Sequence, residues 1–223
     1  MKQLPLEIVA EAPRTFENFM PGANALAVDH LATLAAGAPP VYLWGPPGSG
    51  KTHLLQATAA RALARGGRVA SFGSAFAAPW SESDAWSLVL LDDVERYDES
   101  QQRAAFGLFV EAATQGWPIV AAGAAPPVDL PLREDLRTRL GWGHVFALQP
   151  LGEAGARAAL RREADRRGVF LSDDVMDYLL TRFARDLKNL MTQLDRLDAY
   201  ALSHQRAITV PLLRRMSDED GKA

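Results

Sequence analysis

The segment 45–52 reads Gly-Pro-Pro-Gly-Ser-Gly-Lys-Thr and combines the residue types that bind a polyphosphate. Glycines let successive backbone N–H groups point into one concavity, and the start of a helix adds partial positive charge there. In this pattern Lys51 reaches the β- and γ-phosphates, and the Thr52 hydroxyl ligates the magnesium that bridges them. We predict a site for ADP or ATP with Mg²⁺, formed by Gly45, Pro46, Pro47, Gly48, Ser49, Gly50, Lys51, Thr52 and His53.

A tight surface turn is the alternative explanation for a Gly-Pro-Pro-Gly stretch. The nucleotide site requires a strand before the loop and a helix start after it. The apolar run 41–44 and the helical run 53–57 supply both, so the sequence favours nucleotide binding.

Asp92 and Asp93 are a second candidate for chemistry, because they end a short apolar run that resembles a strand buried on both faces. In nucleotide-hydrolysing proteins with such a loop, the acid at the end of this strand orders the magnesium, and its neighbour can polarise the attacking water. We predict the first role for Asp92 and the second for Asp93. A helix cap or turn would explain one acid more easily than two.

The elements that must hold these residues alternate between strands and helices up to residue 149, which predicts a three-layer α/β fold with a parallel sheet. From residue 150 the pattern is helical only. We predict an extended tail at 1–12, a nucleotide-binding core at 13–149 and a small all-helical lid at 150–223. The expected strands are 41–44, 68–73, 87–94, 117–123 and 144–148; the expected helices are 24–36, 53–65, 100–115, 132–140, 153–167, 172–183, 186–203 and 211–216.

Composition narrows the classes of function. The net charge of the 223 residues is only −3, so there is no global basic field for DNA, and any contact with DNA is expected to be indirect or weak. The absence of cysteine excludes disulfides and thiol-bound metals. No apolar run is long enough for a membrane span and no signal peptide is recognisable, so we expect a cytoplasmic protein without membrane contact.

Other chemistries find little support. The four histidines show no metal-ligand spacing, and no serine lies in a Gly-x-Ser-x-Gly turn. Arginines between 157 and 167 could touch nucleic acid, but the acids among them favour a solvated helix face.

The strand-loop-helix start, the acidic strand, a later arginine before the last strand and the helical lid together resemble the AAA+ ATPases. Three stretches resemble the ATPase domain of the bacterial replication initiator DnaA. They are GKTHLL at 50–55, LLDD at 90–93 and DLRTRLGWG at 135–143.

Two further stretches, FMPGAN at 19–24 and QLPL at 3–6, resemble the Hda group of DnaA homologues, which bind the sliding clamp and switch DnaA off. The sequence ends after the lid, so we expect no helix-turn-helix DNA-binding domain of the kind that follows the lid in DnaA.

The resemblance implies roles for several residues. Gln3, Leu4 and Leu6 correspond to the clamp-binding motif, although a tail that packs its leucines on its own domain is the alternative. Arg139 corresponds to the arginine finger, which stabilises charge on the γ-phosphate of a neighbouring subunit's ATP; outside this sequence context it would be read as a surface arginine.

Two departures from the family pattern bear on hydrolysis. The polar sensor at the end of the fourth strand falls near Ala121, Ala122 and Gly123, where we expect no side chain to contact a γ-phosphate. The lid arginine that completes the nucleotide site falls on Lys188, which keeps the charge but loses the bidentate fork. We therefore expect a nucleotide-binding protein with weak ATPase activity of its own.

The resemblance implies a negative regulator of replication initiation, which binds DnaA and the DNA polymerase III sliding clamp and promotes hydrolysis of DnaA-bound ATP in trans. One alternative is a DnaA-like ATPase acting in initiation or helicase loading. Another is a non-catalytic adaptor. The sequence leaves open whether ADP or ATP is the cellular ligand and whether the chain self-associates.

Overall fold

The computed structural model describes residues 13–80, 86–183 and 187–220. Its first part is a five-stranded sheet in the order β2-β3-β4-β1-β5, and all four strand pairs are parallel. This confirms the predicted three-layer α/β class. The strands are β1 (Val41–Trp44), β2 (Val69–Phe72), β3 (Leu88–Leu91), β4 (Ile119–Gly123) and β5 (His144–Ala147).

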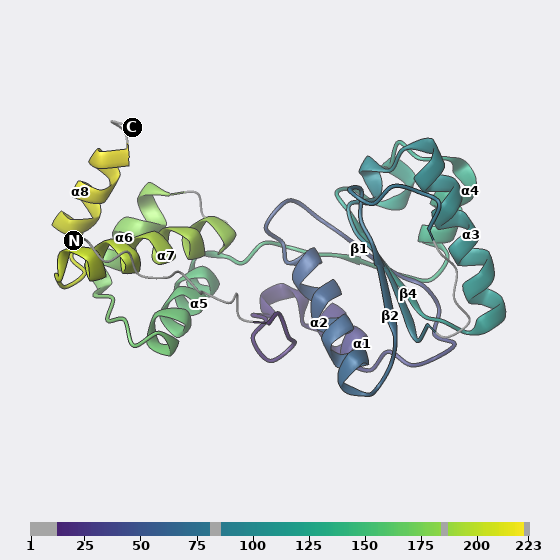
Figure 1. The fold of residues 1–223 in the computed structure, drawn as a ribbon, viewed down its shortest axis with the longest axis horizontal. Coiled ribbons are helices and arrows are strands. Elements are labelled where there is room, and N and C mark those ends of the chain that lie inside the picture. Colours follow the sequence, from purple (N-terminus) through teal and green to yellow (C-terminus); the bar gives the residue numbers. More distant parts are fainter. Residues whose placement is uncertain (1–12, 81–85, 184–186, 221–223) are drawn as a thin grey trace, which may run out of the picture.

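Helices cover both faces of the sheet, and Figure 1 shows α1 and α2 on one side with α3 and α4 on the other. Alternation along each strand feeds two cores, since successive side chains point to opposite faces. Tyr42 packs among the α3 and α4 side chains, whereas Val41 and Leu43 pack with those of α1 and α2. The helices are α1 (Ala25–Ala32), α2 (Lys51–Ala64), α3 (Glu99–Gln115) and α4 (Glu134–Gly141), with short 3₁₀ turns η1 (Gly22–Asn24), η2 (Val94–Arg96) and η3 (Pro127–Asp129).

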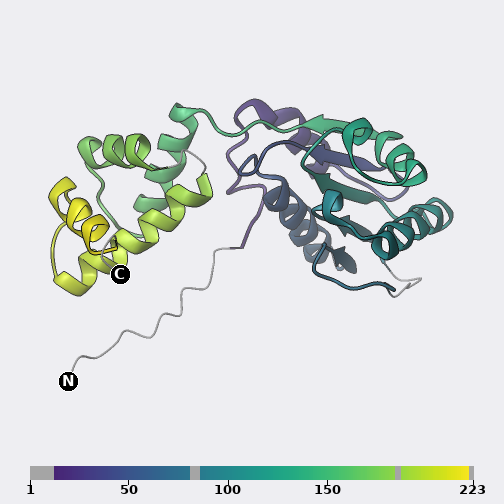
Figure 2. The same ribbon diagram turned by 90° about the horizontal axis from the view of Figure 1, so that it is seen from above.

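A bundle of helices follows β5 and lies beside the sheet domain, joined to it by one extended segment (Figure 2). The centre of the apolar stripe of its longest helix is fully buried, as its helical spacing predicts, with Leu190, Leu194 and Leu197 at 0% exposure. We call this bundle the lid. Its helices are α5 (Glu153–Arg166), α6 (Asp173–Arg182), α7 (Leu187–His204) and α8 (Val210–Asp220).

The arginines between 157 and 167 are engaged within the protein. Arg161 pairs with Asp173 at 2.6 Å, and Arg166 and Arg167 both donate to Glu163, which holds the pKa of that carboxyl at about 2. This pairing favours the solvated-face interpretation over a nucleic-acid surface. Within the described ranges, no helix has the length and apolar character needed to cross a bilayer.

Candidate functional site

The loop between β1 and α2 has the backbone geometry that a phosphate-binding loop needs. Gly50 precedes the first residue of α2 and has φ +97°, a left-handed conformation that glycine adopts without steric cost. A Cβ at this position would lie 2.6 Å from Cε2 of Phe19, so both conformation and space require glycine. The N-terminal amides of α2 therefore open directly onto the loop.

Lys51 wraps around the loop that precedes it. Its ammonium donates hydrogen bonds to the carbonyl of Gly45 at 2.7 Å and to that of Pro46 at 3.1 Å. Burial lowers the pKa of Lys51, while the nearby carboxylates of Glu95, Asp92 and Asp93 oppose that shift. The Lys51 ammonium thus lies near three carboxylates.

Thr52 lies in the first turn of α2 and contacts Asp92, which follows the carboxyl end of β3, as their predicted shared role requires. The Thr52 hydroxyl donates to Oδ2 of Asp92 at 2.9 Å, across 40 positions of sequence. Burial raises the pKa of the Asp92 carboxyl, and this hydrogen bond opposes the shift. One hydroxyl and one carboxylate, with phosphate oxygens and water completing the shell, suit Mg²⁺, so these two residues would hold the ion and keep it beside the phosphates.

Asp93 holds a strained backbone conformation. Its φ is +52°, which is uncommon for a residue with a side chain, and its N–H donates to Oδ1 of Asp92 at 3.0 Å. Such strain collects at functional sites. It turns the chain sharply after β3 and lets η2 fold back beside the strand ends.

Ser49 and His53 contribute differently. The Ser49 hydroxyl is buried without a hydrogen-bond partner among the described residues, and a bound phosphate can supply one. The His53 ring bonds through Nε2 to the carbonyl of Thr15 at 2.9 Å and meets the Phe19 ring edge-on at 5.1 Å. Its imidazole therefore ties the preceding segment to the loop, and direct nucleotide binding by His53 stays a prediction.

Sequence reasoning missed the contact that joins this segment to the approach to the lid. Asn24 is buried, donates to the carbonyl of Gln149 at 2.8 Å and accepts from its N–H at 2.9 Å. On the lid itself, Arg162 donates to the carbonyl of Asn18. The segment 15–24 thus contacts the loop, the lid and the link between sheet and lid.

Sequence reasoning also missed Glu95. The residues at the end of β4 carry no polar side chain, as expected, but the Glu95 carboxylate reaches this place from η2 and accepts from the Ala124 N–H at 3.2 Å. A third acid three positions after Asp92 was the available signal.

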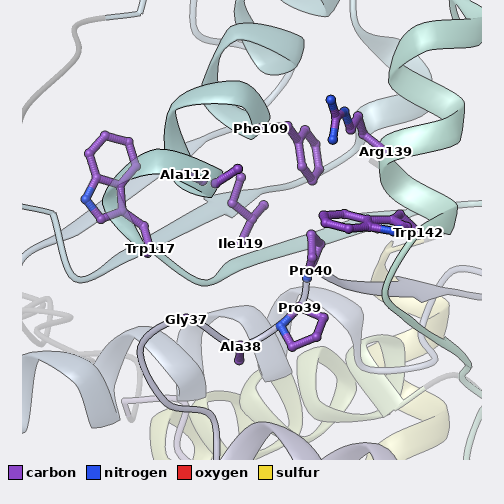
Figure 3. Close-up of a pocket in the computed structure, with 12 residues that line it drawn as sticks. Gly37, Ala38, Pro39, Pro40, Phe109, Ala112, Trp117, Ile119, Arg139 and Trp142 are labelled. Carbon is purple, nitrogen blue, oxygen red and sulfur yellow. The ribbon is translucent and has the colours of Figure 1, made fainter.

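Arg139 lies far from this site, at the opposite edge of the sheet. It borders a pocket of about 380 Å³ lined by residues that precede β1, β4 and β5, whereas the phosphate-binding loop follows β1. Its guanidinium carbon is 5.9 Å from the centre of the Phe106 ring and 5.8 Å from that of Trp142, within cation–π range. Figure 3 shows Arg139 and Trp142 at one end of this pocket, with the Trp142 indole beside Pro40.

Arg139 forms no salt bridge within the described parts of the chain, unlike Arg133 of the same segment, which pairs with Asp135 at 2.7 Å. Trp142 is 67% exposed beside it. A half-buried guanidinium without an acid and an exposed indole together form a surface suited to an anionic group on another molecule.

Four predicted residues have no described side-chain geometry. Gln3, Leu4 and Leu6 lie outside the described residues. Lys188 lies in the first turn of α7, and its side chain is outside the description.

Comparisons with known proteins cover both parts of the chain. Residues 11–72 match the family model of the bacterial DnaA ATPase domain, and residues 153–216 match that of the Hda lid domain. An uncharacterized protein of Haemophilus influenzae is 32% identical over 232 residues, which cover 96% of this chain and 98% of that protein.

Solved structures show the same fold. Domain III of the Thermotoga maritima replication initiation protein DnaA matches with a TM-score of 0.79 at 20% identity, with 98% of each chain covered. AMPPCP-bound DnaA from Aquifex aeolicus matches with a TM-score of 0.69 at 24% identity, over 83% of this chain and 65% of that one. The chain therefore spans just under two thirds of the Aquifex protein.

The strand order, the phosphate-binding loop after β1, the acids after β3 and the helical lid define an AAA+ protein. Within this class, the chain belongs to the family of DnaA-related proteins that carry the Hda lid domain.

Proposed function

We propose that this chain is a negative regulator of replication initiation that binds ADP or ATP with Mg²⁺ and inactivates DnaA by promoting hydrolysis of its bound ATP. The observation that carries the proposal is the position of Arg139, on the sheet edge opposite the chain's own phosphate-binding loop. An arginine there is at the wrong end of the strands to reach the phosphates on the chain's own loop, so under this proposal it acts on a nucleotide that another subunit presents. Such an arginine stabilises charge that develops on the γ-phosphate.

The surroundings of Arg139 support a partner-binding role. Trp142 and Phe106 hold the guanidinium by cation–π contact, which fixes its direction without neutralising its charge. Arginine and tryptophan are the residue types that most often dominate the binding energy of protein interfaces. We propose DnaA as the partner because the chain belongs to a DnaA-related family and because AAA+ subunits present their nucleotides to one another.

The residues around Lys51 would bind the chain's own nucleotide. Lys51 and the amides at the start of α2 would take the phosphates, and Thr52 and Asp92 would hold the ion. Asp93 would orient water, and Lys188 would approach from the lid. We propose that this nucleotide chiefly fixes a conformation, with weak hydrolysis of its own.

The tail would tether the regulator to the DNA-loaded sliding clamp through Gln3, Leu4 and Leu6, so inactivation would follow replication. The setting we propose is the cytoplasm. Contact with DNA would pass through the clamp, and self-association of the chain stays open.

The experiment measures loss of ATP from DnaA preloaded with radiolabelled ATP, with and without the chain, in the presence of clamp loaded on DNA. We expect the chain to convert DnaA-bound ATP to ADP much faster than DnaA does alone. Strong DNA-stimulated turnover by the chain itself, without an effect on DnaA, would favour the DnaA-like ATPase instead.

A further inference from the structure

Glu95 stands at the nucleotide site although no strand or loop of the predicted site contains it. Asp93 turns the chain with its left-handed conformation, and η2 then carries Glu95 to the end of β4. There its Oε2 accepts the Ala124 N–H at 3.2 Å. The carboxylate is therefore anchored to the sheet.

The end of β4 has room for no other polar side chain. A Cβ on Gly123 would clash with the Tyr42 hydroxyl and would lie 3.0 Å from Val94 and 3.2 Å from Oε2 of Glu95. The Tyr42 hydroxyl is itself engaged, since it donates to the carbonyl of Ala125 at 2.8 Å. Glu95 is thus the polar group that this edge offers to a ligand.

The sheet order locates this carboxylate relative to the ligand. β4 lies between β1, which leads to Lys51, and β3, which leads to Asp92. Glu95 accepts the N–H of Ala124, the residue after β4, so its carboxylate lies between the strand ends that lead to Lys51 and Asp92. It therefore faces the place where Lys51 would meet the β- and γ-phosphates.

We propose that Glu95 is a specificity-determining residue that weakens binding of a terminal γ-phosphate relative to a nucleoside diphosphate. The inference rests on the proposed nucleotide site. A triphosphate brings additional negative charge to the end of the phosphate chain, and a carboxylate anchored there repels it more than it repels the β-phosphate. In a partly buried site, such repulsion amounts to roughly tenfold in affinity.

The test replaces the charge and keeps the hydrogen-bond acceptor. Glu95→Gln retains an oxygen for the Ala124 N–H, and the dissociation constants of ADP and of the non-hydrolysable AMPPCP are measured by titration calorimetry with Mg²⁺. We expect the constant for AMPPCP to fall about tenfold and that for ADP to change less than about twofold. Equal shifts for both ligands, or no shift for either, would overturn the proposal.

Two further variants separate charge from structure. Glu99 lies in the first turn of α3, and its exposed carboxylate pairs with Arg103. Glu99→Gln should change the dissociation constant of neither ADP nor AMPPCP. Glu95→Asp keeps the charge and should retain the wild-type preference for ADP over AMPPCP. If Glu95→Asp prefers ADP as weakly as Glu95→Gln does, the effect is not one of charge. If the wild-type chain binds neither nucleotide, both the proposed nucleotide site and this inference are wrong. If Glu95→Gln shifts the constants for ADP and AMPPCP equally, only the proposed role of Glu95 is wrong.

Discussion

Arg139 and Lys51 lie at opposite edges of one parallel sheet. Lys51 follows the carboxyl end of β1, whereas Arg139 borders the pocket formed where β1, β4 and β5 begin. A strand of four residues such as β1 spans roughly 13 Å, so these two cations cannot both contact the γ-phosphate of one nucleotide. Under our proposal, Lys51 binds the chain's own nucleotide, and Arg139 acts on the nucleotide bound to a partner subunit.

Replacing Gly50 tests the loop geometry. Gly50→Ala forces a side chain into a left-handed conformation and against Phe19, whereas Gly66→Ala forces the same conformation where no atom lies within 4 Å. We expect Gly66→Ala to lower the free energy of unfolding by about 1–2 kcal/mol and Gly50→Ala to lower it further. Urea unfolding measures both, and equal losses would show that Phe19 yields freely.

Asn24 tests the connection between the loop side and the lid. Asn24→Ala leaves both main-chain groups of Gln149 without their partner, and we expect the free energy of unfolding to fall by about 2–3 kcal/mol. Thr138→Ala removes an exposed hydroxyl that donates to its own helix, and should cost less than about 0.5 kcal/mol. If both variants unfold at the same urea concentration, Asn24 does not carry the connection.

The sequence was sufficient for the parts of the fold that local pattern determines. One contiguous stretch specifies the strand 41–44, the glycine-rich loop and the helix start at Lys51. The strand at 88–91 is predicted by its apolar run. Helical periodicity also predicted the lid helices.

What the sequence could not supply depends on distant contacts. Asn24 and Gln149 are 125 positions apart, and nothing local to either indicates the pair. The sequence analysis does not single out Glu95, because the left-handed conformation of Asp93, which redirects it, is not predictable from residue type. The expectation that the end of β4 offers no polar group held for its own side chains and missed a neighbour from η2.

The buried Asp92 predicts a pH-dependent trade between stability and binding. Burial raises the pKa of Asp92 in the native state above the ordinary value of 3.8. The native state therefore binds more protons than the unfolded state, and it loses stability as pH rises above 3.8. Asp92→Asn removes this cost, and its urea midpoint should exceed that of the wild type by a margin that grows as pH rises above 3.8 and levels off above the raised native pKa.

The same variant should lose Mg²⁺-dependent enhancement of nucleotide binding, since Asn is a weaker ligand than a carboxylate. Titrations with and without EDTA measure this. An Asp92→Asn chain that keeps the full magnesium effect would remove Asp92 from the proposed ion site.

The QLPL motif at residues 3–6 is predicted to bind the sliding clamp. We expect titration calorimetry with ADP present to give micromolar or tighter binding for the intact chain. Gln3→Ala should abolish that binding because the glutamine amide would dock in the clamp pocket. No binding by the intact chain would take the clamp out of the mechanism.

The most direct test of action in trans is single-turnover hydrolysis of ATP on DnaA with wild-type and Arg139→Ala chains. We expect Arg139→Ala to abolish the acceleration, which for an arginine finger is on the order of 10³ or more, while leaving the chain's own nucleotide affinity unchanged. Arg137→Ala, on the same helix, is the matched control and should retain most of the acceleration. An Arg139→Ala chain that still inactivates DnaA at the wild-type rate would contradict the arginine finger and favour an adaptor.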